Sequence, residues 1–204
     1  MKILYINALY SPLIKGGAEI SLKVLVEGMQ ARGHEVVVLS LKPEEGLIDE
    51  TIDGVKVYRA GLKNSYWPFY NFKPGKANRL IWHIRDRYNT AMRHSVRKVI
   101  EIEQPDIVSC HNLVGWSVAV WDEIKKTNTP LVQVLHDLYL LCPNSDMYKE
   151  NRSCDKQCFQ CSILRNQHRA LSNQVDAVVG ISKFILKRFT DFHYFQRAKK
   201  ICDL

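Results

Sequence analysis

Two adjacent glycines preceded by a lysine lie near the start of the sequence, between an apolar segment and an amphipathic one. Lys15, Gly16 and Gly17 belong to the loop SPLIKGGAE, which comes after the predicted strand KILYIN at residues 2–7. Glycines at the start of a helix let backbone N–H groups approach a phosphate closely, with the positive end of the helix dipole behind them. The alternative is a tight turn between strand and helix. The loop matches neither Gly-x-Gly-x-x-Gly nor a P-loop, so it carries neither of those two phosphate-binding motifs.

A histidine and an aspartate form a second candidate site. His136 and Asp137 come directly after the apolar run of residues 131–135. An imidazole titrates near neutral pH, so His136 could donate a proton or hydrogen-bond a hydroxyl group. Asp137 could orient that imidazole or cap the following turn. We predict a catalytic role for both residues, with a structural hydrogen bond as the alternative for the histidine.

Four cysteines follow at a spacing that metal sites use. They form the pattern C-x11-C-x3-C-x2-C with Cys142, Cys154, Cys158 and Cys161, in a loop at about residues 138–161. Four thiolates close a tetrahedral zinc site and leave no open coordination position, so such a zinc would be structural. It would hold the loop beside His136. Reduced thiols, or a partial disulfide, are the alternative.

Aromatic and basic side chains are mixed in the segment from residue 62 to residue 88. Together they suit a membrane interface or an anionic lipid-linked acceptor, and they also suit single-stranded nucleic acid. Packing in the core is the alternative, and it is favoured for Trp82 and Tyr88. The aromatic members are Trp67, Phe69, Tyr70, Phe72, Trp82 and Tyr88, and the basic ones are Lys63, Lys73, Lys76, Arg79, Arg85 and Arg87.

Alternating strand and helix patterns must position these residues. In the first helix, Leu22 and Val26 belong to the apolar face and Glu19 to the opposite, polar face. Strands that alternate with long helices imply right-handed crossovers, so we predict an α/β, doubly wound parallel sheet of the Rossmann-like type. The strands are expected at residues 2–7, 35–40, 55–60, 106–110, 131–135 and 177–180, and the helices at 16–32, 77–103, 116–126, 162–174 and after the capping residue Ser182.

The predicted sheet determines where a ligand should bind. In open parallel sheets, ligands bind beyond the carboxyl ends of the strands. This rule adds Asn7, His111 and Ser182 to the candidate substrate-binding residues, since each follows a predicted strand. It also places the glycine loop and His136 at one cleft for a small molecule.

Composition limits the partners. The chain has 204 residues, enough for one domain, and is 46% hydrophobic and 25% charged. No apolar run approaches the ~20 residues that span a bilayer, and residues 1–9 lack the apolar core of a signal peptide, so a cytoplasmic location is expected. The net charge of +8 favours an anionic partner: nucleic acid, an acidic membrane face or a phosphorylated small molecule. In the cytoplasm, the cysteines would be thiols or metal ligands.

Four stretches of the chain resemble the retaining glycosyltransferases of family four, whose GT-B fold has two facing Rossmann-like domains. The resemblance covers nearly the whole chain, and the stretches occur in the expected order. They are KILYINALYSPLIKGGAEISLKVLVEGMQARGHEVVVLS, QPDIVSCHN, LVQVLHDLYLLCP and VDAVVGISKFILKRF.

The resemblance implies that residues 1–204 are the N-terminal, acceptor-side domain of such an enzyme. Gly16 and Gly17 would meet the donor phosphates or the acceptor, and His136 would lie near the transferred sugar. The reaction would need no metal or other cofactor. The donor would be a nucleotide-sugar and the acceptor a glycan or a lipid-linked molecule, in surface polysaccharide synthesis at the inner face of the membrane. The C-terminal donor-binding domain, with its paired-glutamate motif, is absent from the sequence, so a hexosyltransferase fragment that is inactive alone is expected.

Two other functions are consistent with the residues. A non-catalytic module could use the basic, aromatic surface to dock on a membrane or glycan. A zinc-stabilised nucleic-acid binder would use the charge and the cysteines, and its binding would depend steeply on salt. It ranks last, because the glycine loop and His136 point to a small-molecule cleft, and no nucleic-acid partner is expected.

Overall fold

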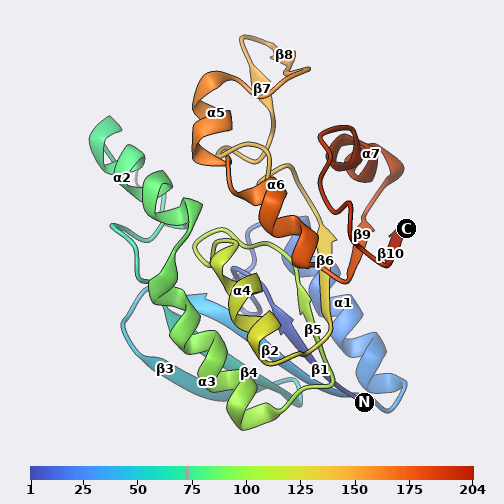
Figure 1. Cartoon of the computed structure of the whole chain (residues 1–204). Helices are drawn as coiled ribbons and strands as arrows, with labels where there is room; N and C mark the ends of the chain where they lie inside the picture. Colours follow the sequence, from blue (N-terminus) through green and yellow to red (C-terminus); the bar gives the residue numbers. More distant parts are fainter. Residues whose placement is uncertain (72–73) are drawn as a thin grey trace.

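The computed structural model describes residues 1–71 and 74–204, which form an eight-stranded sheet with helices on both faces (Figure 1). The strand order is β10-β9-β6-β5-β1-β2-β4-β3. Every pairing is parallel except that of β3 with β4. The strands are β1 (Lys2–Ile6), β2 (Glu35–Lys42), β3 (Leu47–Ile52), β4 (Val55–Gly61), β5 (Ile107–Cys110), β6 (Leu131–Leu135), β9 (Ala177–Gly180) and β10 (Lys200–Asp203).

Helices cover the two faces with separate hydrophobic cores. Alternate side chains of β1 point to opposite faces, as strand geometry requires. Ile3 packs in the cluster that includes Leu22 and Val26 of α1, and Leu4 packs with the side chains of α3 and α4. The helices are α1 (Gly17–Ala31), α2 (Lys76–Arg87), α3 (Arg93–Glu103), α4 (Ala119–Lys126), α5 (Phe159–Leu164), α6 (His168–Leu171) and α7 (Lys183–Asp191), with short 3₁₀ turns at Thr90–Met92 and Ser172–Gln174.

The chain order places the topological switch between β1 and β5. After β1 the chain builds β2 and β4 on one side, and it then crosses to β5, β6 and β9 on the other. Crossovers leave in opposite directions at this point, and a crevice opens at the carboxyl ends of the two strands. The predicted α/β doubly wound sheet is therefore confirmed.

Three expected elements differ from the structure. The single helix predicted at 77–103 was wrong: α2 ends at Arg87 and α3 begins at Arg93. Tertiary hydrogen bonds hold the break, because Ser117 Oγ accepts from the backbone N–H of Asn89 at 2.7 Å, and Asn89 donates to the carbonyl of Lys63 at 2.9 Å. The helix predicted at 162–174 is likewise divided, and the one predicted at 116–126 begins only at Ala119.

Two strands at the edges of the sheet were missed. β3 forms a hairpin with β4 across the turn at Asp53–Gly54, where both residues have positive φ. Its central residues are exposed, so it lacks the apolar run that marked the other strands. β10 is exposed throughout and pairs with β9.

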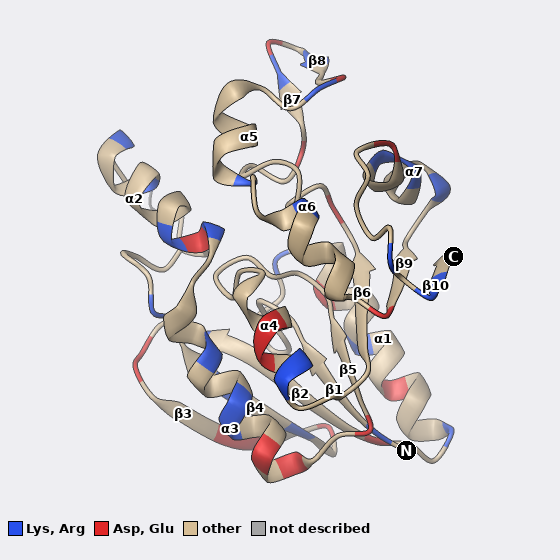
Figure 2. Ribbon diagram, viewed as in Figure 1, with Lys and Arg blue, Asp and Glu red and all other residues tan. Residues whose placement is uncertain are grey.

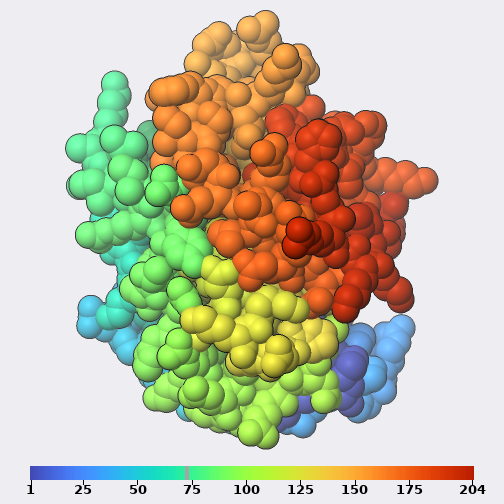
Figure 3. Space-filling view, in the orientation of Figure 1, coloured from blue at the N-terminus to red at the C-terminus, as the bar shows by residue number. Residues whose placement is uncertain are grey.

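The cysteine-bearing loop projects from the carboxyl end of the sheet. It holds a small hairpin of β7 (Tyr148–Lys149) and β8 (Arg152–Ser153), followed by α5. Its orange surface forms one end of the molecule in Figure 3. Lys and Arg residues lie along the neighbouring α2 (Figure 2).

Candidate functional site

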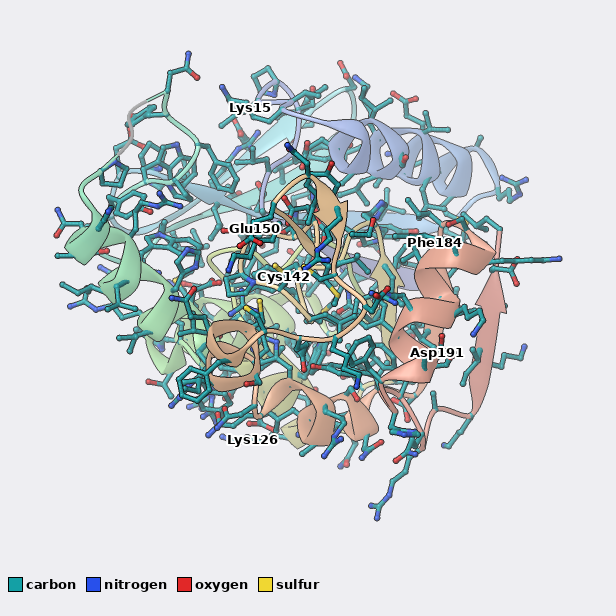
Figure 4. All side chains as sticks on the ribbon, turned by 90° about the horizontal axis from the view of Figure 1, so that it is seen from above. Lys15, Lys126, Cys142, Glu150, Phe184 and Asp191 are labelled. Atoms are coloured by element: carbon teal, nitrogen blue, oxygen red, sulfur yellow. The ribbon has the colours of Figure 1, made fainter. Side chains whose placement is uncertain are left out.

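A groove of about 420 Å³ opens at the carboxyl end of the sheet. It brings together five of the residues that the sequence nominated: Lys15, Gly16, Gly17, His136 and Asp137. Figure 4 shows Lys15 at the start of α1 on this face, seen from above. The remaining lining residues are Leu9, Ala18, Glu19, Ser21, Phe69, Asn112 and Ile181. Of these, the sequence singled out only Phe69, as a member of the aromatic segment.

His136 is held by a chain of hydrogen bonds that begins inside the sheet. Its Nε2 lies 2.9 Å from Nδ1 of His111, and the two rings stack with centroids 5.2 Å apart. The other nitrogen of His111, Nε2, lies 3.1 Å from Oγ of Ser109. Both Ser109 and His111 are buried, so they fix the ring of His136 from behind. His111 therefore positions His136 rather than lining the groove.

The direction of this chain determines what His136 can offer to a ligand. A neutral imidazole has one N–H, so both hydrogen bonds must run the same way. If Ser109 donates first, His136 accepts at Nε2 and offers an N–H at Nδ1. In the opposite direction, Nδ1 of His136 carries a lone pair and can act as a base.

Burial keeps both imidazoles neutral near pH 7. It lowers the pKa of His136 to about 4. It also lowers the pKa of His111 to about 3, where the neighbouring His136 adds to the effect. The pair therefore serves as a neutral hydrogen-bonding unit and not as a cation.

Asp137 caps a turn. Its Oδ1 accepts a hydrogen bond from the backbone N–H of Tyr139 at 2.8 Å, which is one of the two roles that the sequence suggested. The other role, orienting the imidazole of His136, belongs to His111. Burial raises the pKa of Asp137 to about 6, and the negative charge of Glu19 acts in the same direction. This carboxyl can thus exchange a proton close to neutral pH.

Glu19 is the charged residue of the groove that sequence reasoning missed. It was assigned to the polar face of α1, but only 5% of its surface is exposed. Its Oε2 accepts the backbone N–H of Gly16 at 2.8 Å and that of Lys15 at 3.3 Å. A glutamate three residues after the N-cap is a capping-box signal, which could have identified it.

The structure gives Gly17 no steric reason to be glycine. A Cβ at Gly17 would have no atom within 4 Å, and its φ is not positive. The absent side chain instead keeps the start of α1 open toward the groove, where the first N–H groups of a helix lack partners within the helix.

Asn7 and Ser182 lie outside the groove lining. Asn7 is fully buried; its side chain donates to the carbonyl of Leu9 at 2.6 Å and accepts from the backbone of Asn112 at 2.8 Å. It joins the ends of β1 and β5 and so shapes the groove. The side chain of Ser182 caps α7 by accepting from Ile185 at 3.3 Å.

The cysteines gather at the start of α5. Sγ of Cys161 lies 3.4 Å from Sγ of Cys158 and 3.8 Å from Sγ of Cys142. All four cysteines line a second groove, of about 580 Å³, between α2 and α5. Across the described residues, no three His, Cys, Asp or Glu side chains are arranged to hold a metal ion. Structural zinc therefore remains a prediction from the sequence.

The aromatic segment divides between core and surface. Trp82 is buried and donates to the carbonyl of Tyr66 at 3.1 Å, and Tyr88 is partly buried against the core and hydrogen-bonds Asp122. Core packing is thus confirmed for both. Phe72 and Lys73 lie outside the described residues. In the part of the chain that is described, no helix is long and apolar enough to cross a membrane.

The family model for Glycosyltransferase Family 4 matches residues 15–201. The chain belongs to this family. A protein of Klebsiella pneumoniae, described as an uncharacterized 42.6 kDa protein in the cps region, is 32% identical over 200 residues. That alignment covers 98% of this chain and 54% of the relative, so the family 4 chain spans about half the length of the curated relative that it matches.

Solved structures show the same fold. The catalytic domain of starch synthase IV from Arabidopsis thaliana, bound to ADP and acarbose, matches with a TM-score of 0.59 and 13% identity over 99% of this chain and 51% of that one. Sucrose-phosphate synthase from Thermosynechococcus elongatus matches with a TM-score of 0.61 and 13% identity over 100% and 47%. The family 4 chain therefore has the Rossmann-like fold of one domain of GT-B glycosyltransferases, as the sequence resemblance implied.

Proposed function

We propose that this chain is the acceptor-side domain of a retaining glycosyltransferase that moves a hexosyl group from a nucleotide-sugar to a glycan or lipid-linked acceptor. The observation that carries the proposal is the single groove that joins the open start of α1 to the neutral His136 at the switch point of the sheet. Such a groove suits a ligand with a phosphate at one end and hydroxyl groups at the other.

The donor phosphates would bind at the start of α1. Glu19 already occupies the N–H groups of Lys15 and Gly16, so an incoming phosphate is left with the next N–H groups of the first turn and the ammonium of Lys15. The positive helix end stabilises that negative charge. A donor-phosphate oxygen would help to take the acceptor proton, so the transfer needs no metal or other cofactor.

The sugar would be held by His136. Its neutral ring, fixed by His111 and Ser109, presents Nδ1 as a hydrogen-bonding group whose orientation is set before the ligand arrives. Preorganised hydrogen bonds of this kind stabilise a transition state more than mobile ones do. Asp137, with its raised pKa, would exchange a proton with a hydroxyl group in the same groove.

The acceptor side would face an anionic membrane surface. In α2, Leu80 and Ile84 are 54% and 52% exposed. Both line the groove between α2 and α5, together with the basic residues Lys76 and Arg79. Exposed apolar side chains next to basic ones suit the headgroup region of an anionic bilayer. The relative in a cps region supports a role in surface polysaccharide synthesis. The same surface supports the second candidate, a non-catalytic module that docks on a membrane or glycan.

Nucleotide release from a panel of UDP-, GDP- and ADP-sugars distinguishes these functions. The test compares the complete reading frame that encodes this chain with the 204-residue chain alone. Release only by the longer protein would support the glycosyltransferase and identify its donor. No release by a folded longer protein, over a range of glycan and lipid-linked acceptors, would favour the docking module.

A further inference from the structure

Three thiols form a connected row in the groove between α2 and α5. Cys158, at the N-cap of α5, and Cys161, within its first turn, have sulfur atoms 3.4 Å apart. Cys142 lies 3.8 Å beyond Cys161. Figure 4 shows Cys142 near the middle of this face, with other sulfur atoms next to it. The proposed glycosyl transfer uses none of these thiols.

The segment that carries the thiols has little core of its own. α5 contains no buried residue, and the four residues of β7 and β8 are exposed. A short element without a core is stabilised by cross-links more than by packing. Cys161 packs against the main core, whereas Cys158 is the N-cap of α5, which has no buried residue. A small shift of Cys158 can therefore bring the two sulfur atoms from 3.4 Å to the bonding distance of about 2 Å.

We propose that Cys158 and Cys161 are a thiol modification site at which the two residues form a reversible disulfide with each other. The oxidant is a low-molecular-weight disulfide such as oxidised glutathione. The Cys158 thiolate attacks one sulfur of the oxidant, which gives a mixed disulfide and releases one glutathione thiolate. Cys161 then loses its proton and attacks the Cys158 sulfur, which closes the protein disulfide and releases the second glutathione. The protein loses two electrons and two protons, and the oxidant becomes two thiols.

The surroundings favour Cys158 as the attacking residue. Cys158 lies at the N-cap of α5, whereas Cys161 lies between Cys158 and Cys142 and packs against the core. Both residues line the groove of about 580 Å³ between α2 and α5, which gives a small disulfide access to them. A thiol that an oxidant can reach, next to a second thiol that can close the disulfide, is the one expected to react first.

Peptide mapping tests this assignment on the unmodified chain. The reduced protein is incubated with oxidised glutathione, quenched with a maleimide and digested, and the linked peptides are identified by mass spectrometry. We expect a Cys158–Cys161 link, two fewer maleimide-reactive thiols out of six cysteines, and full recovery with a reductant. Cys158→Ser should abolish the link, whereas the matched variant Cys202→Ser, at an exposed cysteine of β10, should leave it unchanged.

Three outcomes would overturn the proposal. A Cys142–Cys161 link would show that Cys158 and Cys161 are not the pair that forms the disulfide. Mixed disulfides with glutathione that never close would show that the two sulfur atoms cannot meet. Stoichiometric zinc in freshly purified, reduced protein, by metal analysis, would show that the thiols are metal ligands, as the sequence pattern alone suggested.

Discussion

His136 depends on its neighbours for both orientation and charge. His111 and Ser109 hold its ring, and burial keeps it neutral. We predict that His136→Ala lowers kcat of the complete enzyme by about 10²-fold, because one preorganised transition-state hydrogen bond is lost. Steady-state kinetics measures the loss, and thermal unfolding shows whether the fold is kept.

The exposed His94 of α3 offers a matched control, because it lies outside the groove. His94→Ala should leave kcat unchanged. An unchanged kcat in His136→Ala as well would return His136 to a purely structural role.

Gly17 and Gly180 differ in whether a side chain at the position would disturb ligand binding or the packing of the fold. A Cβ at Gly17 meets open space, whereas a Cβ at Gly180 would lie 2.6 Å from Cβ of Leu186. We predict that Gly17→Val raises KM for the nucleotide-sugar and leaves the melting temperature nearly unchanged. Gly180→Val should lower the melting temperature by several degrees, since overpacking typically costs about 1–3 kcal/mol. Equal KM for Gly17→Val and the wild type would remove the phosphate-binding role of this loop.

Individual residues show the limits of sequence reasoning. Lys15, Gly16, Gly17, His136 and Asp137 could be nominated for one groove because parallel strands end at one edge of the sheet. Which of the strand-end residues face the groove could not be predicted, because that depends on side-chain hydrogen bonds between strands, as in the link from Asn7 to Asn112.

At the scale of elements, the break between α2 and α3 shows how tertiary contacts override helical periodicity. Residues 77–103 carry a pattern that suits one helix, but Asp86 is fully buried. It accepts hydrogen bonds from Tyr139 at 2.7 Å and from the backbone of Gly115 at 2.8 Å, and it lies 3.5 Å from Arg165. Partners so distant in sequence leave no local signal. The central strands were predictable because their continuous apolar runs reflect burial on both faces.

This buried cluster supplies a prediction for the element that it anchors. Asp86→Ala leaves the fully buried guanidinium of Arg165 without its carboxylate, so we expect a loss of about 3–5 kcal/mol in the free energy of unfolding. Urea denaturation measures it. Lys187→Ala, which removes the exposed pair with Asp191 in α7, should change stability by about 0.5 kcal/mol or less. Similar losses in the two variants would contradict the assigned role of Asp86.

At the scale of the whole molecule, acid stability tests the buried imidazoles together. The folded pKa is lowered to about 3 for His111 and His168 and to about 4 for His136 and His83. An unfolded histidine has a pKa near 6.5. Between pH 6.5 and 4 the unfolded chain therefore binds more protons than the folded protein, and the free energy of unfolding falls as the pH is lowered. Asp137 acts oppositely. Its folded pKa is raised to about 6, so its contribution grows as pH falls from 7 toward 4.

The effect of the histidines should exceed that of the aspartate. From pH 7 to pH 5, His111 alone lowers the free energy of unfolding by about 2 kcal/mol, and Asp137 raises it by about 1 kcal/mol. We therefore predict a lower free energy of unfolding at pH 5 than at pH 7, by urea denaturation at both pH values. Asp137→Asn keeps an acceptor for the Tyr139 N–H and removes the opposing titration, so its stability should fall more steeply than that of the wild type. Equal slopes would mean that Asp137 titrates like an unfolded carboxyl, and stability that rises toward pH 5 would show that the imidazoles are charged in the folded protein.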